Sequence, residues 1–170
     1  MLDKKVVELL NQQVNKEFYS AYLYLDFSNY YYNEGLDGFG NWYKIQAQEE
    51  RDHAMLFIQY LQNNDAPVTY EAIDKPETAL NSHMDALKAG LAHEQYVTEL
   101  IHQIYDAANE GKDYRSMQFL DWFVKEQGEE ETNASDLIKK MELFGSDAKG
   151  LYMLDQELAA RTYTAPSLTL

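Results

Sequence analysis

The sequence predicts an all-α fold, a four-helix bundle with one long crossover and a short fifth helix at the C-terminus. The chain of 170 residues contains only 3 prolines, so no proline ring interrupts residues 3–64 or 77–165. Apolar residues recur at spacings of three and four, as in amphipathic helices, and strand-like alternation is absent. Glycines separate these apolar runs. The length fits one domain, residues 1–170.

We expect five helices, at about 4–32, 38–64, 76–109, 113–144 and 147–159. Gly35 marks a short turn after the first helix, so the first two helices should form an antiparallel hairpin. The proline-flanked segment 65–75 connects them to the third helix. Asp74 and Glu77 have the spacing of a capping box at its start, with Pro76 in the first turn.

The third and fourth helices are separated by a second short turn. Gly111 marks this turn, so these helices should form another antiparallel hairpin. Gly145 ends the fourth helix and leaves room for the short fifth one. Two hairpins joined by one long connection give a bundle with a single crossover.

The composition excludes several classes of function. Lys and Arg number 14 against 29 Asp and Glu, a net charge of −15, which repels nucleic acid and anionic membranes and attracts cations. The absence of cysteine excludes disulfides, thiolate zinc sites and iron–sulfur clusters and fits a reducing cytoplasm. No apolar run reaches the ~18 residues of a membrane span, and the N-terminus lacks the apolar core of a signal peptide. We therefore expect a cytoplasmic protein without nucleic-acid or membrane partners.

A carboxylate interrupts the apolar face of each long helix near its middle. The residues concerned are Glu17, Glu50 with His53, Glu94, and Gln127 with Glu130. Each of the two pairs is spaced by three residues, so its members share one face of a helix. All six lie 15 to 19 residues from the glycine of their own hairpin turn. In antiparallel hairpins this places them at similar heights, and we expect them to converge at mid-bundle.

Carboxylates that converge in a core need compensation, because each buried ion costs on the order of several kcal/mol. They can share protons or bind cations. Four carboxylates and one imidazole carry enough charge for two divalent ions, and this ligand set suits iron or manganese. Taken singly, a Glu-x-x-His pair can be a solvated helix face and a Gln can be an ordinary core hydrogen-bonder. The common height on four helices favours the metal site.

Other polar and aromatic residues surround this group. Tyr24, seven residues after Glu17, points toward the site one level away, where it packs in the core, donates a hydrogen bond to a ligand or supplies an electron. A second acidic set adjoins the first in sequence and lies about 100° around the helices; it comprises Glu49, Glu126 and Glu129. This set is either a solvated acidic face or a third cation site. We interpret the remaining histidines, His83, His93 and His102, as surface or structural residues.

With these residues in place, the chain resembles a bacterial non-haem ferritin over essentially its whole length. The matching residues are Glu17, Tyr24, Glu50-x-x-His53, Glu94 and Glu126-Gln127-x-Glu129-Glu130. The resemblance implies that Glu17 and His53 hold one iron, that Glu94 and Glu130 hold a second, and that Glu50 bridges them. Gln127 would form a hydrogen bond near the second iron. The third site of bacterial members would comprise Glu49, Glu126, Glu129 and Glu130.

The resemblance also separates this chain from bacterioferritins, which carry haem. Their second Glu-x-x-His is replaced here by Gln127-x-x-Glu130, and their haem-binding Met by Arg51. We therefore expect no haem.

The function implied is iron storage with ferroxidase activity. Fe(II) would be oxidised to Fe(III) by dioxygen or hydrogen peroxide and deposited as a ferric oxyhydroxide mineral inside a closed shell of roughly 24 subunits. Two alternatives stay open: a di-iron oxidase or peroxidase with a separate substrate, and a passive metal buffer or structural shell.

Overall fold

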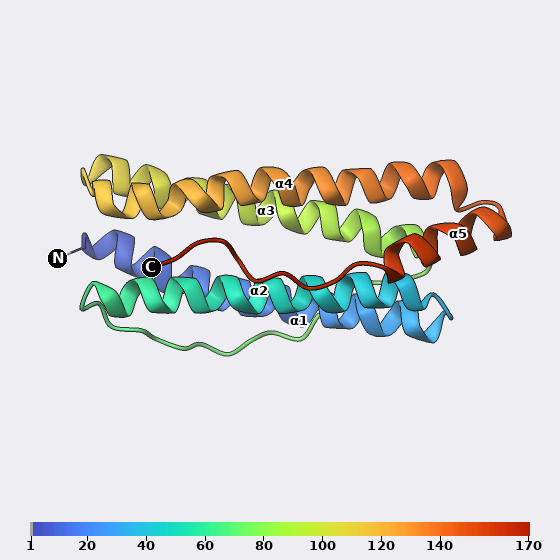
Figure 1. Ribbon diagram of the computed structural model, residues 1–170. Coiled ribbons are helices and arrows are strands. Elements are labelled where there is room, and N and C mark those ends of the chain that lie inside the picture. Colours follow the sequence, from blue (N-terminus) through green and yellow to red (C-terminus); the bar gives the residue numbers. More distant parts are fainter. Residues whose placement is uncertain (1) are drawn as a thin grey trace.

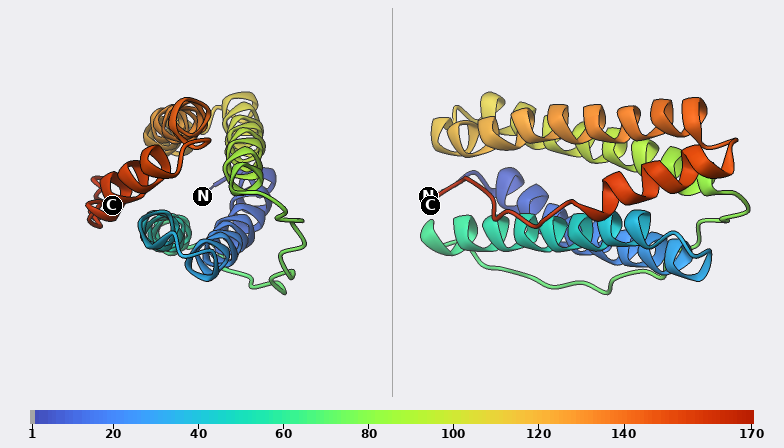
Figure 2. Two further views of the ribbon diagram at one scale, coloured as in Figure 1. Left: turned by 90° about the vertical axis from the view of Figure 1, so that its right-hand side faces the viewer. Right: turned by 45° about the vertical axis from the view of Figure 1, so that its right-hand side comes forward.

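The computed structural model describes residues 2–170, and all regular structure within them is helical. The five helices are α1 (Lys4–Asn33), α2 (Asp37–Asn63), α3 (His83–Glu110), α4 (Tyr114–Phe144) and α5 (Ala148–Ala159). The α1–α2 hairpin lies beside the α3–α4 hairpin, and α5 packs against the ends of α2 and α4 (Figures 1 and 2). The predicted all-α fold, a four-helix bundle with one crossover and a short fifth helix, is confirmed.

The start of the third helix was predicted wrongly. We expected this helix to begin at residue 76, but α3 begins at His83. The start signal lies at Ser82 and Asp85: the Asp85 Oδ2 accepts from the backbone N–H groups of Asn81 and Ser82 at 2.8 and 3.0 Å. The capping box expected from Asp74 and Glu77 is not used, and the segment around Pro76 is extended.

Chain length explains this difference. The crossover must run back along the whole of α2 (Figure 1), and the 27 residues of that helix span about 40 Å at 1.5 Å each. The expected connection, residues 65–75, would reach about 36 to 40 Å at full extension, so it could span this distance only without any bend. The observed connection, residues 64–82, is long enough, and it is fixed to α1 on the way. Asn15 Nδ2 donates to the Ala72 carbonyl at 3.0 Å.

The core consists of two apolar clusters, one toward each end of the bundle. One is built around Leu10, Phe57, Ile101, Leu120 and Phe123. The other is built around Tyr24, Phe27, Phe39, Leu87 and Met141. The six polar residues that interrupt the apolar faces lie between these clusters. They are therefore enclosed by apolar side chains above and below, and water reaches them poorly.

Candidate metal centre

The four long helices bring the six predicted residues into one buried belt. Their exposed fractions lie between 1% and 6%, for Glu17, Glu50, His53, Glu94, Gln127 and Glu130. Such burial of four carboxyl groups is exceptional, because Asp and Glu are rarely buried without a partner. The belt is therefore the strongest candidate for a functional site.

Glu17, Glu50 and His53 form the tightest part of the belt. One ligand atom from each lies within 4.8 Å of the other two, the only such group of three or more His, Cys, Asp or Glu side chains found in residues 2–170. His53 Nδ1 lies 3.5 Å from Glu50 Oε2. Gln13, one turn before Glu17, donates to Glu17 Oε1 at 2.7 Å. The other oxygen, Glu17 Oε2, is buried without a hydrogen-bond partner among the residues described.

Glu94 lies on the far side of the belt and is held by two side chains. The hydroxyl of Tyr24 donates to Glu94 Oε1, and Gln127 Nε2 donates to Glu94 Oε2 at 3.2 Å. Tyr24 also packs edge-on against His93, which is half-buried and lies 2.7 Å from the Ser20 hydroxyl. His93 thus has a structural position behind Tyr24, as the sequence indicated.

Glu130 joins the belt through a residue that the sequence analysis did not single out. Gln46, one turn before Glu50, donates from Nε2 to Glu50 Oε1 at 3.1 Å and to Glu130 Oε2 at 2.8 Å. One amide thereby links carboxylates on α2 and α4. The spacing of four between Gln46 and Glu50 was a visible signal, but the partner on α4 was not.

The protonation states follow from this crowding. Burial, and then the charge of Glu50, raise the pKa of Glu17 and of Glu94 to about 8. Burial raises the pKa of Glu130 well above its usual value, with help from Glu94 and Glu50. Burial by itself would raise the pKa of Glu50 and lower that of His53. The hydrogen bond and the opposite charges of this pair outweigh burial, so the pKa of Glu50 is lowered and that of His53 is raised to about 10. Without metal, the belt therefore stores protons on several carboxyl groups at neutral pH.

The group fits a divalent cation. A buried carboxylate oxygen without a partner costs about 1 to 3 kcal/mol, and Glu17 Oε2 is such an atom. Two carboxylates and an imidazole converge at this point, with no thiolate in the chain. Oxygen donors with one nitrogen suit iron or manganese. The raised pKa values mark positions where a cation would replace protons.

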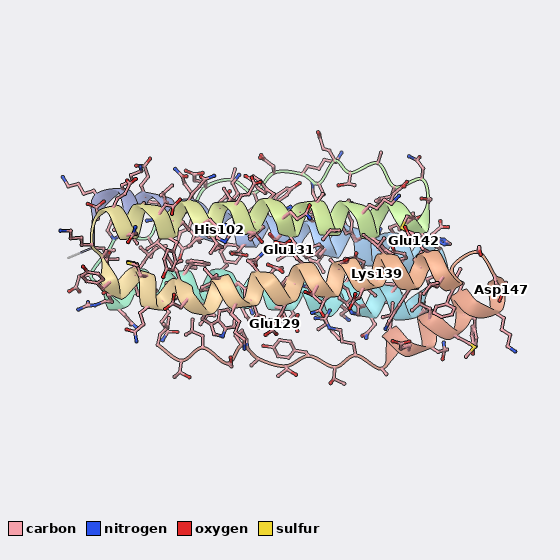
Figure 3. The ribbon with its side chains drawn as sticks, turned by 90° about the horizontal axis from the view of Figure 1, so that it is seen from above. His102, Glu129, Glu131, Lys139, Glu142 and Asp147 are labelled. Carbon is pink, nitrogen blue, oxygen red and sulfur yellow. The ribbon has the colours of Figure 1, made fainter. Side chains whose placement is uncertain are left out.

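The second acidic set is arranged differently. Glu49 is half-buried and accepts from Arg161 Nη2 at 2.5 Å. Glu126 is also half-buried, and burial raises its pKa and that of Glu49. Glu129 is exposed, lies 3.3 Å from Lys125 and occupies the edge of α4 nearer the C-terminal tail, whereas Glu131 lies nearer α3 (Figure 3). In residues 2–170 these carboxylates do not converge as closely as Glu17, Glu50 and His53 do.

Comparisons with known proteins agree with this architecture. A family model described as a ferritin-like domain matches residues 7–144. A bacterial non-heme ferritin from Campylobacter jejuni is 40% identical over 156 residues, covering 92% of this chain and 93% of the relative. One from Staphylococcus saprophyticus is 37% identical over 163 residues, covering 96% and 98%.

Solved structures give the same result. An open-pore ferritin from the archaeon Archaeoglobus fulgidus matches with a TM-score of 0.93 and 40% identity, covering 95% of this chain and all of its own (100%). An engineered closed form of that ferritin matches with a TM-score of 0.94, also at 40% identity, and the match covers 96% of this chain and 100% of the other. No helix in residues 2–170 combines the length and apolar character needed to cross a membrane. Fold, belt and relatives lead to one conclusion: the chain belongs to the ferritin family.

Proposed function

We propose that this protein stores iron and is a ferroxidase, with the buried belt as its di-iron site. The observation that carries the proposal is the partnerless Glu17 Oε2 inside the Glu17–Glu50–His53 group. Glu17 and His53 hold one Fe(II), Glu94 and Glu130 hold the second, and Glu50 bridges them. The names of the relatives, bacterial non-heme ferritins, support iron as the cargo.

The reaction needs only iron and an oxidant. Two Fe(II) ions give two electrons either to dioxygen, which takes up two protons and becomes hydrogen peroxide, or to hydrogen peroxide, which takes up two protons and becomes two water molecules. The anionic ligands favour the 3+ over the 2+ charge of the ion. Fe(III) then leaves the belt and hydrolyses to a ferric oxyhydroxide mineral in the cavity of a closed shell of roughly 24 subunits.

The surrounding residues hold the ligands in place. Gln13, Gln46 and Gln127 each donate to a ligand carboxylate. Tyr24 orients Glu94 through its hydroxyl, and burial with the nearby Glu94 charge raises its pKa well above the usual value, so the phenol keeps its proton. We propose that Tyr24 also supplies an electron during iron oxidation. Such partners behind the ligands fix their orientation.

A third cation site is part of the proposal. Glu49, Glu126 and Glu129, with Glu130, accept an ion beside the di-iron site. Two of these carboxylates are half-buried with raised pKa values, which supports a cation there. Haem is not part of the proposal, and an isolated sample should show no Soret band.

Aerobic Fe(II) titration tests the main proposal. The protein should bind about two Fe(II) per subunit before slower uptake, elute as a large shell in size-exclusion chromatography, and accumulate mineral. Glu50→Ala should slow the first oxidation most, because it removes the bridging ligand. Glu99→Ala, an exposed carboxylate on the same bundle, is the control.

The same experiment separates the alternatives. A passive buffer or structural shell would bind iron without faster oxidation. An oxidase with a separate substrate would turn over without accumulating mineral, as a small species. An unchanged initial rate in Glu50→Ala would overturn the assignment of the belt.

A further inference from the structure

The amide of Gln46 has to face the ligands in one particular way. Its Nε2 donates to Glu50 and Glu130, which belong to different helices. If the amide turned over, Oε1 would face the Glu50 carboxylate, and one acceptor would repel the other. Whatever fixes this amide therefore fixes the positions of two predicted ligands.

Arg161 fixes the amide. This residue lies in the tail that follows α5, and both Nη1 and Nη2 donate to Gln46 Oε1 at 3.1 Å. A guanidinium can only donate, so the oxygen of Gln46 must face Arg161 and the NH₂ group must face the carboxylates. The order Arg161, Gln46, then Glu50 with Glu130 is a continuous chain of donors and acceptors.

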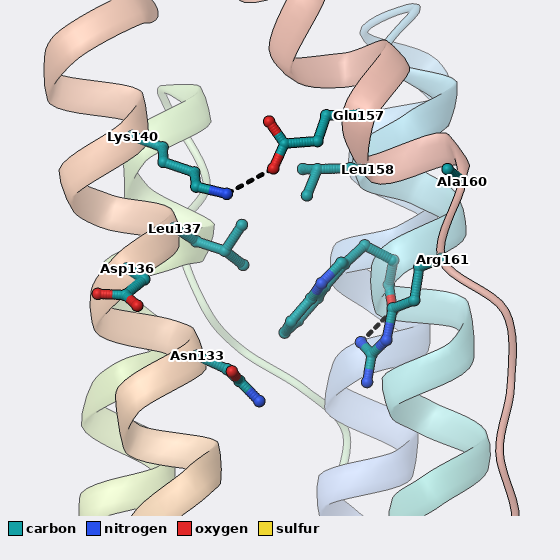
Figure 4. Close-up of a pocket in the computed structure, with 9 residues that line it drawn as sticks. Asn133, Asp136, Leu137, Lys140, Glu157, Leu158, Ala160 and Arg161 are labelled. Atoms are coloured by element: carbon teal, nitrogen blue, oxygen red, sulfur yellow. Dashed lines mark hydrogen bonds and ion pairs between the residues drawn. The ribbon is translucent and has the colours of Figure 1, made fainter.

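Arg161 is itself held firmly. Its guanidinium lies 4.3 Å from the ring centre of Trp42, within the range of a cation–π contact. It donates to the Trp42 carbonyl at 3.1 Å and to Glu49 at 2.5 Å, and its own carbonyl accepts from Asn41 at 3.1 Å. Figure 4 shows Arg161 directly after the end of α5, at the pocket that Leu137 also lines. Its side chain is only 20% exposed.

We propose that Arg161 is a positioning residue of the di-iron site: through Gln46 it sets the orientation of Glu50 and Glu130. The inference rests on the proposed function of the belt. It gives the C-terminal tail a part in metal binding at the di-iron site, although Arg161 donates to Gln46 and Glu49 and to none of the five proposed di-iron ligands. A lysine would not replace Arg161, because a single ammonium lacks the planar fork and the stacking face.

The experiment measures binding of Co²⁺ to the metal-free protein without oxygen, by calorimetry and by the visible absorption of bound cobalt. Arg161→Gln should weaken binding about tenfold or more, as is typical when a residue behind a ligand is removed, and should change the spectrum. Gln46→Ala should do the same. In the double variant the loss should be no greater than in the worse single variant, because both act along one chain of contacts.

A matched control removes a different contact of the same tail. Tyr163 donates to Asp52 at 2.5 Å and forms no hydrogen bond with Gln46, so Tyr163→Phe removes a contact of the tail but spares the hydrogen bonds from Arg161 to Gln46. It should leave cobalt binding and the spectrum unchanged. An equal loss in Tyr163→Phe, or additive losses in the double variant, would overturn the inference.

The cobalt measurement also separates this inference from the proposed function. If the wild type binds cobalt with the predicted dependence on Arg161 but does not oxidise Fe(II), ferroxidase activity is wrong and the inference holds. If the wild type oxidises Fe(II) and Arg161→Gln binds cobalt normally, the function holds and the inference is wrong.

Discussion

The carboxylate of Asp155, in α5, accepts a hydrogen bond at 2.8 Å from the backbone N–H of Gly38, at the start of α2. The same oxygen accepts from Phe39 N at 3.1 Å. The residue before α2 is Leu36, whose side chain has no acceptor, so Asp155 caps the helix from a distant part of the chain. The negative charge also lies at the positive end of the helix dipole. Helix α5 thus stabilises the start of α2. The same contact fixes α5, from whose end the tail with Arg161 continues.

Asp155→Ala should destabilise the protein by about 1 to 3 kcal/mol, the range for losing an N-cap and leaving buried N–H groups without acceptors. Asp155 is 6% exposed, so water does not readily replace it. Denaturant unfolding at a fixed subunit concentration measures this. Asp147→Ala, which removes the exposed cap of α5 itself, is the control and should cost less. Equal losses would mean that Asp155 does not support α2.

A second variant approaches the same contact from the other side. A Cβ at Gly38 would lie 1.7 Å from the Asp155 carbonyl oxygen, so Gly38→Ala should displace α5 even though the carboxylate remains. The variant should lose stability and become more sensitive to proteolysis in the tail. A stable, resistant variant would contradict the close packing.

The helices could be predicted from the sequence because local signals agree with tertiary structure. Gly35 takes a positive φ of 76° in the first turn, a conformation that glycine favours. The start of α3 could not be predicted in the same way. Pro76 and the Asp74–Glu77 spacing imitate a helix start, whereas the true start is set by the length that the crossover must span. That constraint belongs to the assembled bundle.

Glu129→Ala should alter iron turnover after the first load while leaving the first oxidation intact. Glu129 is exposed and pairs with Lys125, so it cannot hold the first two ions. Stopped-flow oxidation with successive additions of about two Fe(II) per subunit measures both phases. Lys125→Ala controls for the lost ion pair. A slower first oxidation in Glu129→Ala would place this residue in the primary site.

Part of the candidate site could be predicted from the sequence, and part could not. The six residues of the belt are visible because each breaks an apolar repeat, and the hairpin turns set their heights. Arg161 lies in a segment without periodicity, and its contact with Gln46 joins residues 115 positions apart. No local pattern encodes such a contact, so the contacts from Arg161 through Gln46 to the ligands could not be predicted from the sequence.

The stability of the metal-free protein should fall as pH rises from about 6 to about 9. Glu17 and Glu94 have pKa values of about 8 in the folded protein against 4.5 for an ordinary glutamate, so between these values the native state binds more protons than the unfolded state. The pKa of His53 is raised from 6.5 to about 10, so this residue also makes stability fall with rising pH, up to a higher pH. Stability is therefore lost as these protons leave.

Thermal unfolding of the metal-free protein across this range measures the slope, and Glu17→Gln should flatten it. Added metal should reverse the trend, because metal binding releases protons and strengthens as pH rises. A melting temperature that rises with pH in the metal-free protein would show that Glu17 and Glu94 are ionised in the native state.

The last prediction concerns Glu94→Gln. Glu94 is 3% exposed and near Glu50, whose negative charge helps raise its pKa. The neutral amide should change the stability of the metal-free protein little at about pH 4, where Glu94 is protonated in both the folded and the unfolded states, and should stabilise it increasingly as pH rises toward about 8, because the wild-type carboxyl group must then take up a proton to fold. It should also reduce the stabilisation by metal, which for a full site reaches about 2.7 kcal/mol at a 100-fold excess over the dissociation constant.

Calorimetry of both proteins at two pH values, with and without a redox-inert divalent ion, measures both effects. Gln127 can turn its amide to accept from the new NH₂ group, so the fold should persist. If Glu94→Gln destabilises the metal-free protein at high pH and keeps the full metal response, Glu94 is not a ligand.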